Sequence, residues 1–303
     1  MLRERFGVSL AAVALMGVAC ANSPSAPAAS PQIEASPGHA APAGSPSPSN
    51  GPLRVTASVE RWGLAAPLSR EVVFPAGHAL IVAGGLEDAD VSTSRVTRLN
   101  VSTGRRTGHW SLPAGVHDAA GIVAGGADLV VGGGAGAATG AVQGFPVTGG
   151  APHQVGSLPQ PRSDLSATTA RGKSYIVGGF SGSNMASAVL VTRDGKTFRT
   201  LAQLPIPVRY AAVAVAGGAL WVVGGRTDPG GVSTTAAVQR VDLRTGRAVV
   251  ASHLAAPLSD ASAVTINGTV LVCGGDRNGA SATDRVLRLD TVTGRLTPAG
   301  RLA

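Results

Sequence analysis

Five polar side chains recur along the chain at a nearly constant spacing. They follow one another at intervals of 48, 46, 46 and 50 residues and are Arg70, Asp118, Asp164, Tyr210 and Asp260. If they meet at one place, their three carboxylates can hold a cation through oxygen ligands, or accept hydrogen bonds from a sugar or a peptide. The alternative is structural: each aspartate caps backbone amides where a strand begins, and the arginine pairs with a neighbouring aspartate. The spacing leaves both interpretations open.

A second pattern keeps the same spacing: a short apolar run that ends in two glycines. The five runs span 79–85, 128–133, 174–179, 219–225 and 270–275. Each run is too short for a helix and rich in β-branched residues, so it is interpreted as a strand buried on both faces. The paired glycines supply positive φ angles and let neighbouring backbones approach closely.

The remainder of each unit supplies more strands. A second apolar strand precedes each glycine pair, at 72–74, 119–123, 165–168, 211–215 and 261–264. A third strand that ends in a turn glycine follows, at 96–104, 141–149, 188–195, 238–246 and 286–294. A repeat of this length is typical of a propeller blade, because one small sheet cannot bury its own faces and needs neighbours around a ring.

A fourth strand carries Trp110 in the first unit and Phe198 in the third, and then leads into a proline-containing link such as Leu112-Pro113. This combination resembles the kelch repeat, which builds the central propeller of galactose oxidase-like proteins. All five units share the glycine pair, whereas the tryptophan is found in one. The resemblance implies an all-β propeller of four-stranded antiparallel blades. We predict five full blades plus an N-terminal closing strand or half blade within 54–64, with six blades as the alternative.

In such a propeller, the five recurrent polar side chains would circle one mouth of the central channel. The loops after the glycine pairs emerge on the same face and bring further charged residues to its rim. These rim residues are Glu87, Asp88, Asp90, Arg226, Asp276 and Arg277. The mouth is therefore the candidate ligand site.

The N-terminal part divides into two segments ahead of the predicted propeller at 53–303. Residues 1–20 have basic residues, an apolar stretch and the run Gly17-Val18-Ala19-Cys20, which resembles the lipobox of bacterial lipoproteins. In that family the cysteine is lipidated, so Cys20 is the expected lipidation site. Residues 21–52 are rich in Ala, Ser and Pro and are predicted to be a disordered tether. We expect an exported protein, anchored by lipid to the outer face of the bacterial cytoplasmic membrane; secretion is the alternative.

We compared the residues of this sequence with those of two families of propeller enzymes. The copper site of galactose oxidase-like enzymes needs two tyrosines, two histidines and a cross-linked cysteine, but this chain offers Tyr175, Tyr210 and a Cys273 within a buried strand. Its histidines lack metal-ligand spacing. The turn at 192–198 resembles the Asp-box of sialidase-type propellers, where the box is structural. We therefore assign no catalytic residue, metal or cofactor, and keep a glycosidase or lyase as the alternative function.

The formal net charge of +8 raises the question of an anionic partner. However, the 25 basic residues include only two lysines, Lys173 and Lys196, and the arginines are spread over all units without an aromatic stacking surface. Nucleic acid is therefore not the expected partner. We predict a monomeric module whose loops bind a protein, peptide or glycan of the cell envelope.

Overall fold

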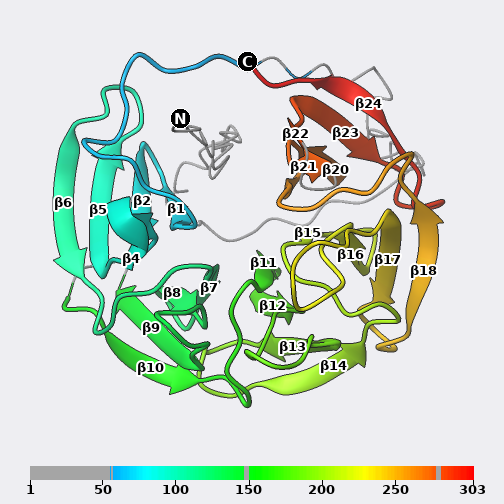
Figure 1. The fold of residues 1–303 in the computed structure, drawn as a ribbon, viewed down its shortest axis with the longest axis horizontal. Helices are drawn as coiled ribbons and strands as arrows, with labels where there is room; N and C mark the ends of the chain where they lie inside the picture. The colour runs from blue at the N-terminus through cyan, green and yellow to red at the C-terminus, as the bar shows by residue number, and fades with distance from the viewer. Residues whose placement is uncertain (1–54, 56, 147–149, 278–280) are drawn as a thin grey trace, which may run out of the picture.

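The computed structural model describes residues 55, 57–146, 150–277 and 281–303. Five four-stranded antiparallel sheets stand around a central axis and form a five-bladed β-propeller (Figure 1). The predicted fold class and blade number are confirmed, and the six-blade alternative is wrong. Within the described residues, no helix is long and apolar enough to span a membrane. The predicted signal peptide, Cys20 and tether lie outside these residues.

Each blade uses its strands in the same order from the axis outward. The innermost strands are β1 (Val72–Ala76), β7 (Ala120–Ala124), β11 (Ser166–Ala170), β15 (Ala212–Ala216) and β19 (Ser262–Ile266). The second strands are β2 (Ala79–Ala83), β8 (Ala127–Val131), β12 (Lys173–Val177), β16 (Ala219–Val223) and β20 (Thr269–Cys273). The third strands are β5 (Arg95–Asn100), β9 (Ala141–Pro146), β13 (Ala188–Thr192), β17 (Ala237–Asp242) and β23 (Arg285–Leu289). The outermost strands are β6 (Arg106–Ser111), β10 (His153–Ser157), β14 (Arg199–Gln203), β18 (Ala248–His253) and β24 (Leu296–Arg301).

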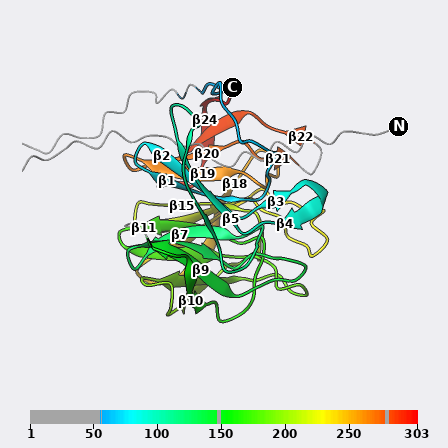
Figure 2. The same ribbon diagram turned by 90° about the vertical axis from the view of Figure 1, so that its left-hand side faces the viewer.

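Short elements in the loops complete the fold. Blade 1 carries β3 (Leu86–Glu87), the 3-10 turn η1 (Asp88–Asp90) and β4 (Val91–Ser92) after its second strand. Blade 5 carries the pair β21 (Asp276–Arg277) and β22 (Ser281–Ala282). Figure 2 shows both hairpins on the same side of the disc, its right-hand side in that view. The loops that follow the glycine pairs therefore share one face, as predicted.

The glycine pairs mark the points where adjacent blades approach most closely. Gly84 and Gly85 have φ angles of 65° and 108°, and the amide of Gly85 donates a hydrogen bond of 2.8 Å to the carbonyl of Val116 in the link to blade 2. A Cβ atom at Gly84 would lie 2.5 Å from that carbonyl oxygen, closer than atoms can approach. Glycine is required here both for the backbone conformation and for the space.

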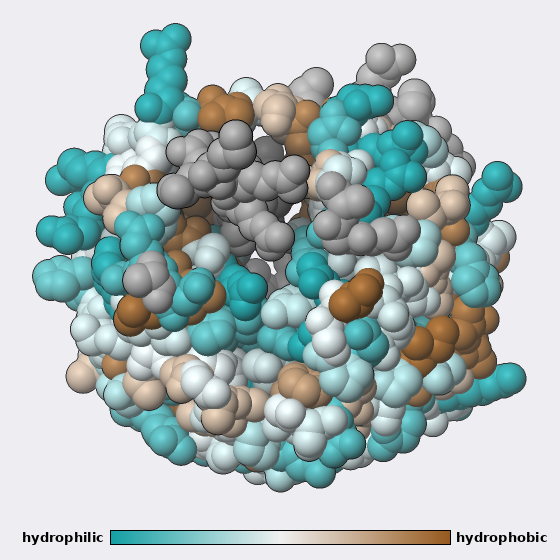
Figure 3. Space-filling view, in the orientation of Figure 1, coloured by the Kyte–Doolittle hydropathy of each residue, from teal (hydrophilic) through white to brown (hydrophobic). Residues whose placement is uncertain are grey.

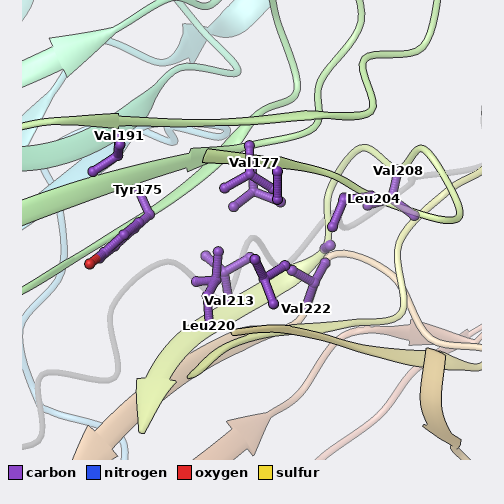
Figure 4. Packing of buried hydrophobic residues seen from close by; sticks show 12 residues of the cluster. Tyr175, Val177, Val191, Leu204, Val208, Val213, Leu220 and Val222 are labelled. Carbon is purple, nitrogen blue, oxygen red and sulfur yellow. The ribbon is translucent and has the colours of Figure 1, made fainter. Parts of the chain in front are cut away.

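The interfaces between blades form the hydrophobic core. Figure 4 shows one of them, where Tyr175 and Val177 of β12 face Val213, Leu220 and their neighbours in blade 4. Trp221 on β16 is fully buried in the next interface. The second strands are buried because each is flanked by strands within its blade and packs against a neighbouring blade. At the seam with blade 1, the cluster around Leu271 of blade 5 is completed by Val55 of the N-terminal segment.

Two buried glutamines hold the proline-containing links between blades. The side-chain oxygen of Gln239 accepts a 3.0 Å hydrogen bond from the amide of Ile206, and its side-chain nitrogen donates one of 3.0 Å to the Ile206 carbonyl. Gln143 accepts from the amide of Ala114 at 2.7 Å in the same way. These bonds satisfy backbone groups that a link containing proline cannot pair in a sheet.

The N-terminal segment contacts the blades on both sides of the seam between blades 5 and 1 (Figure 1). Val55 forms an isolated parallel bridge with Gly300 beside blade 5. Trp62 lies against Gly104 in blade 1 and donates a 3.0 Å hydrogen bond from Nε1 to the carbonyl of Val101. The predicted closing segment therefore takes the form of a single bridge and one anchored tryptophan.

The predicted turns between the third and outermost strands are confirmed where the structure describes them. Gly104, Gly195, Gly246 and Gly294 have φ angles of 66°, 70°, 74° and 75°. Gly149 lies outside the described residues. In the turn that resembles an Asp-box, Asp194 accepts hydrogen bonds of 2.9 Å from the amides of Lys196 and Thr197. These turns lie at the opposite end of the blades from the glycine pairs, so this box has a structural role remote from the mouth.

Candidate functional site

The five recurrent polar residues do meet at one mouth of the channel, where a chain of backbone hydrogen bonds connects them. The amides of the last four residues, from Asp118 through to Asp260, each donate to the carbonyl of the equivalent residue in the preceding blade, at distances of 3.1, 2.9, 3.0 and 2.9 Å. The φ angles of all five residues are 59°, 52°, 59°, 54° and 56°, in the left-handed region that is uncommon for residues other than glycine. The hydrogen bonds between blades offset the cost of this conformation and fix the direction of each side chain.

One part of the mouth, the paired half, is built from Arg209, Tyr210, Arg226 and Asp260. Nη1 of Arg209 and the hydroxyl of Tyr210 each donate a 2.8 Å hydrogen bond to the carboxylate of Asp164. Arg226 donates to Asp260 at 2.8 Å from Nη2. The Tyr210 ring is in contact with both guanidinium groups, whose Cζ atoms lie 5.6 and 5.4 Å from its centroid. The charged and aromatic groups of the paired half are thus bound to one another by ion pairs and cation–π contacts.

The two arginines of the paired half also hold the long loop of blade 4. Nη2 of Arg209 donates a 3.0 Å hydrogen bond to the carbonyl of Pro229, and Nη1 of Arg226 donates one of 3.0 Å to the carbonyl of Gly231. The Arg209 guanidinium also lies 5.2 Å from the centroid of Phe180 in blade 3. The two arginines therefore also fix the loop to the ring.

The other part of the mouth, the open half, is built from Arg70, Asp90, His117 and Asp118. Nη1 of Arg70 donates a 2.9 Å hydrogen bond to Oδ2 of Asp118, yet the arginine side chain is 51% exposed whereas that of the aspartate is 6% exposed. His117 places Nδ1 2.8 Å from the hydroxyl of Ser92 and Nε2 3.7 Å from Oδ2 of Asp118. The guanidinium is therefore held at one edge while much of it faces solvent.

A cavity of about 530 Å³ lies over blades 1 to 3 on this side of the mouth. Its charged lining residues are Arg70, Asp90, Asp118 and Asp164. Small residues, such as Gly134 and Ala137, leave backbone accessible, and Phe180 adds an aromatic wall. The space-filling view of this face shows hydrophilic residues gathered around the central depression (Figure 3). Tyr210 and Asp260 do not line this cavity, so the predicted five residues form one ring but divide between two environments.

The buried position of the ring changes the protonation of its members. Burial raises the pKa of Asp118; the nearby charge of Asp164 raises it further, while the Arg70 guanidinium opposes the shift. Burial and the carboxylates of Asp118 and Asp164 raise the pKa of Tyr210, so its phenol stays protonated at neutral pH. Tyr210 is therefore a hydrogen-bond donor to Asp164 and not a base.

The predicted rim residues have different environments. Asp90 lines the open cavity, and Glu87 pairs with Arg95 in its own blade. Arg226 belongs to the paired half, with Oδ2 of Asp276 3.9 Å from its Nη2. Asp88 lies in the exposed turn η1, and Arg277 is an exposed residue of β21.

Two interpretations of the aspartates can now be corrected. Across the residues that the structure describes, the hydrogen bonds to Asp118, Asp164 and Asp260 come from arginine, tyrosine and serine side chains, so the proposed capping of backbone amides is wrong. The expected pairing of Arg70 with an aspartate is confirmed. The same part of the chain contains no group of three His, Cys, Asp or Glu side chains placed to hold a metal ion, so a shared cation is not supported.

Sequence reasoning missed the residues that precede the ring positions. These are Ser69, His117, Ser163, Arg209 and Ser259. Arg209 and His117 are major parts of the site, and both occur one residue before a position that had been recognised. The regular spacing could have found them, but nothing in the sequence indicated that Arg209 would turn toward Asp164 in the preceding blade.

The architecture defines a five-bladed β-propeller, and comparisons with known proteins find a kelch-like repeat in one blade and a similar overall fold in a solved structure. A family model described as "Kelch motif" matches residues 257–295, which include the glycine pair of blade 5. Among solved structures, one titled "Structure of YjhT" superimposes with a TM-score of 0.64 at 15% sequence identity, over 79% of this chain and 85% of that chain. At this identity the likeness concerns the fold alone. Comparison with curated protein sequences gave no match.

Proposed function

We propose that this protein is an exported binding module that recognises a protein, peptide or glycan of the cell envelope through the open half of the mouth. The observation that carries the proposal is the 530 Å³ cavity, whose wall combines the Arg70–Asp118 pair with Asp164 and Phe180. A rigid ring that presents a few convergent polar groups around a cavity is the common form of a recognition site.

The groups at this cavity suit a ligand with both donors and acceptors. Arg70 uses one nitrogen on Asp118 and is half exposed, so its remaining N–H groups are available to ligand oxygens. Carboxylates accept from ligand hydroxyl or amide groups, while small neighbours such as Gly134 and Gly136 allow close approach to the backbone. The backbone hydrogen bonds of the ring keep these groups in place, which lowers the entropic cost of binding.

A double variant at the mouth and a control variant remote from it test the proposal. In the first, Arg70→Ala is combined with Asp118→Asn at the mouth; in the second, Arg244→Ala alters an exposed turn at the opposite end of blade 4. Binding of the full chain to arrays of peptides, glycans and peptidoglycan fragments is measured, followed by calorimetry on the bound class. We expect the mouth variant to lose at least tenfold in affinity and the control to keep it. Equal binding by all three proteins, or none, contradicts the proposal.

The location at the envelope rests on the lipobox-like run that ends at Cys20. Lipidation there would anchor the propeller, as a monomer, to the outer face of the cytoplasmic membrane of a bacterium. Labelling cells with a palmitate analogue tests it: the wild-type chain should take up label and the Cys20→Ala variant should not. Release of both proteins into the medium would instead support secretion.

A carbohydrate-active enzyme is the second candidate, and one observation favours it. Two carboxyl groups, Asp118 and Asp164, line one cavity, and the pKa of Asp118 is raised as a general acid requires. Hydrolysis of aryl glycosides, or cleavage of an acidic polysaccharide, by wild type but not by an Asp118→Asn variant would establish a glycosidase or a lyase. Binding without turnover in both proteins would exclude it.

A further inference from the structure

A second cavity, of about 440 Å³, lies in the channel directly beneath the mouth. Its wall is made by the first residues of all five innermost strands, and Ala120, Val72 and Val213 are typical members. Apart from Glu71, every residue that lines it is Ala, Val, Leu, Pro, Gly or Ser. Among the described residues, the channel is thus walled by small uncharged side chains and backbone, with one ionisable side chain.

Glu71 departs from the pattern of its own repeat. The equivalent positions in the other blades hold Ala119, Leu165, Ala211 and Ala261. Its Oε2 atom is buried and has no hydrogen-bond partner, and its own backbone amide supplies the hydrogen bond recorded for the carboxyl group. A buried carboxylate oxygen without a donor costs free energy, so a rotation of the Glu71 side chain that brings this oxygen to a donor supplied by a ligand in the channel would be favourable.

The two cavities are neighbours along the axis, because consecutive residues line them. Arg70 lines the upper cavity and Glu71 the lower, and Asp164 and Leu165 are divided in the same way. Arg70 and Arg209 offset two of the three carboxylates Asp90, Asp118 and Asp164, and Glu71 adds a further carboxyl below. The site therefore carries net negative charge although the whole chain carries +8, which favours a cationic ligand group.

We propose that the channel binds a primary alkylammonium group, with its unbranched stem against the apolar wall and its nitrogen at the Glu71 carboxylate. The ammonium is compact and carries three donors, which suits a single carboxylate in a space walled by small side chains. An inorganic cation would need several oxygen ligands, whereas the described residues that line this channel include one carboxyl group. This inference rests on the proposed function, since the rest of the ligand occupies the mouth.

The ammonium has two possible sources, a lysine side chain of a peptide and a free amine, and both serve as probes. Calorimetry on the full chain compares n-butylammonium with n-butanol, and Nα-acetyl-lysine methylamide with its norleucine counterpart. We expect each cation to bind at least tenfold more tightly than its neutral partner. Binding of both cations indicates that the amine suffices, and binding of the lysine derivative alone indicates a peptide ligand; both results support the proposal.

The Glu71→Gln variant tests the residue itself, because it keeps the shape and removes the charge. We expect at least tenfold weaker binding of the cations, while the charge-matched control Glu60→Gln, on the exposed N-terminal segment, binds as wild type does. Thermal melting verifies that each variant is folded. A second readout is the Glu71 carboxyl resonance in NMR, whose pKa should fall when the ammonium is bound.

Equal affinity for cations and neutral partners, or unchanged binding by Glu71→Gln, would overturn the inference. Such a result leaves the proposed function untouched if the Arg70→Ala and Asp118→Asn double variant still loses array binding. Loss of array binding thus tests the proposed function of the mouth, and the difference in affinity between ammonium and neutral probes tests the inference about the channel.

Discussion

The paired half and the open half of the mouth are built from equivalent positions of one repeat, yet they use their charges differently. In the paired half, Arg209 and Arg226 are committed to carboxylates, to the Tyr210 ring and to loop carbonyls. In the open half, Arg70 has one hydrogen bond and is half exposed above a cavity. The comparison indicates that the same backbone geometry can serve two purposes. Where a long loop covers the mouth, the polar side chains stabilise the structure, and where short, glycine-rich loops leave the mouth open, they are available to a ligand.

The largest expected effect is on stability, in the paired half. Arg209→Ala would leave Asp164, whose side chain is 7% exposed, without its cation, and should lower the free energy of unfolding by about 3 kcal/mol. Arg70→Ala, in the open half, should cost less, about 1 kcal/mol, because the arginine is well solvated, His117 stays 3.7 Å from Asp118, and the raised pKa of Asp118 lets this carboxyl take up a proton. Urea unfolding measures both. Equal losses would mean that the two halves do not differ in the way described.

A smaller effect is expected from Tyr210→Phe. This change removes the 2.8 Å hydrogen bond to Asp164 and keeps the ring between the two guanidinium groups. We expect a loss of about 1 kcal/mol in urea unfolding, with ligand binding at the open half unchanged. A loss of binding as large as that of the Arg70 and Asp118 double variant would show that the two halves act as one site.

The smallest expected effect concerns pH and the channel beneath both halves. Burial raises the pKa of Glu71 above its unfolded value, so its contribution to stability is fully present below the unfolded pKa and is lost as pH rises through the folded pKa. Glu71→Gln should therefore melt at a slightly higher temperature than wild type at pH 7 and differ least near pH 4. Melting curves across this range test it; a variant less stable at pH 7 would show that the carboxylate has a stabilising partner.

Much of the fold could be predicted, because its determinants are local. The runs that end in glycine pairs place the second strands, and the turn glycines at 104, 195, 246 and 294 place the hairpins. The ring positions were also found from spacing alone. The pairing of side chains was not, since Asp164 is contacted by Arg209, 45 residues further along the chain. The interpretation of the aspartates as amide caps failed for the same reason.

The sequence by itself determined the period, the strands and the positions that face the channel, because glycine conformation and apolar alternation act within a few residues. Only the tertiary structure decided which arginine neutralises which aspartate, that Phe180 and Tyr210 both lie against the Arg209 guanidinium, and that Glu71 lines the channel among small uncharged residues. The ion pairs of the mouth arise between adjacent blades, where residues about one repeat apart come into contact, as Arg209 and Asp164 do. Their energies therefore depend on the packing of adjacent blades and not on any single unit.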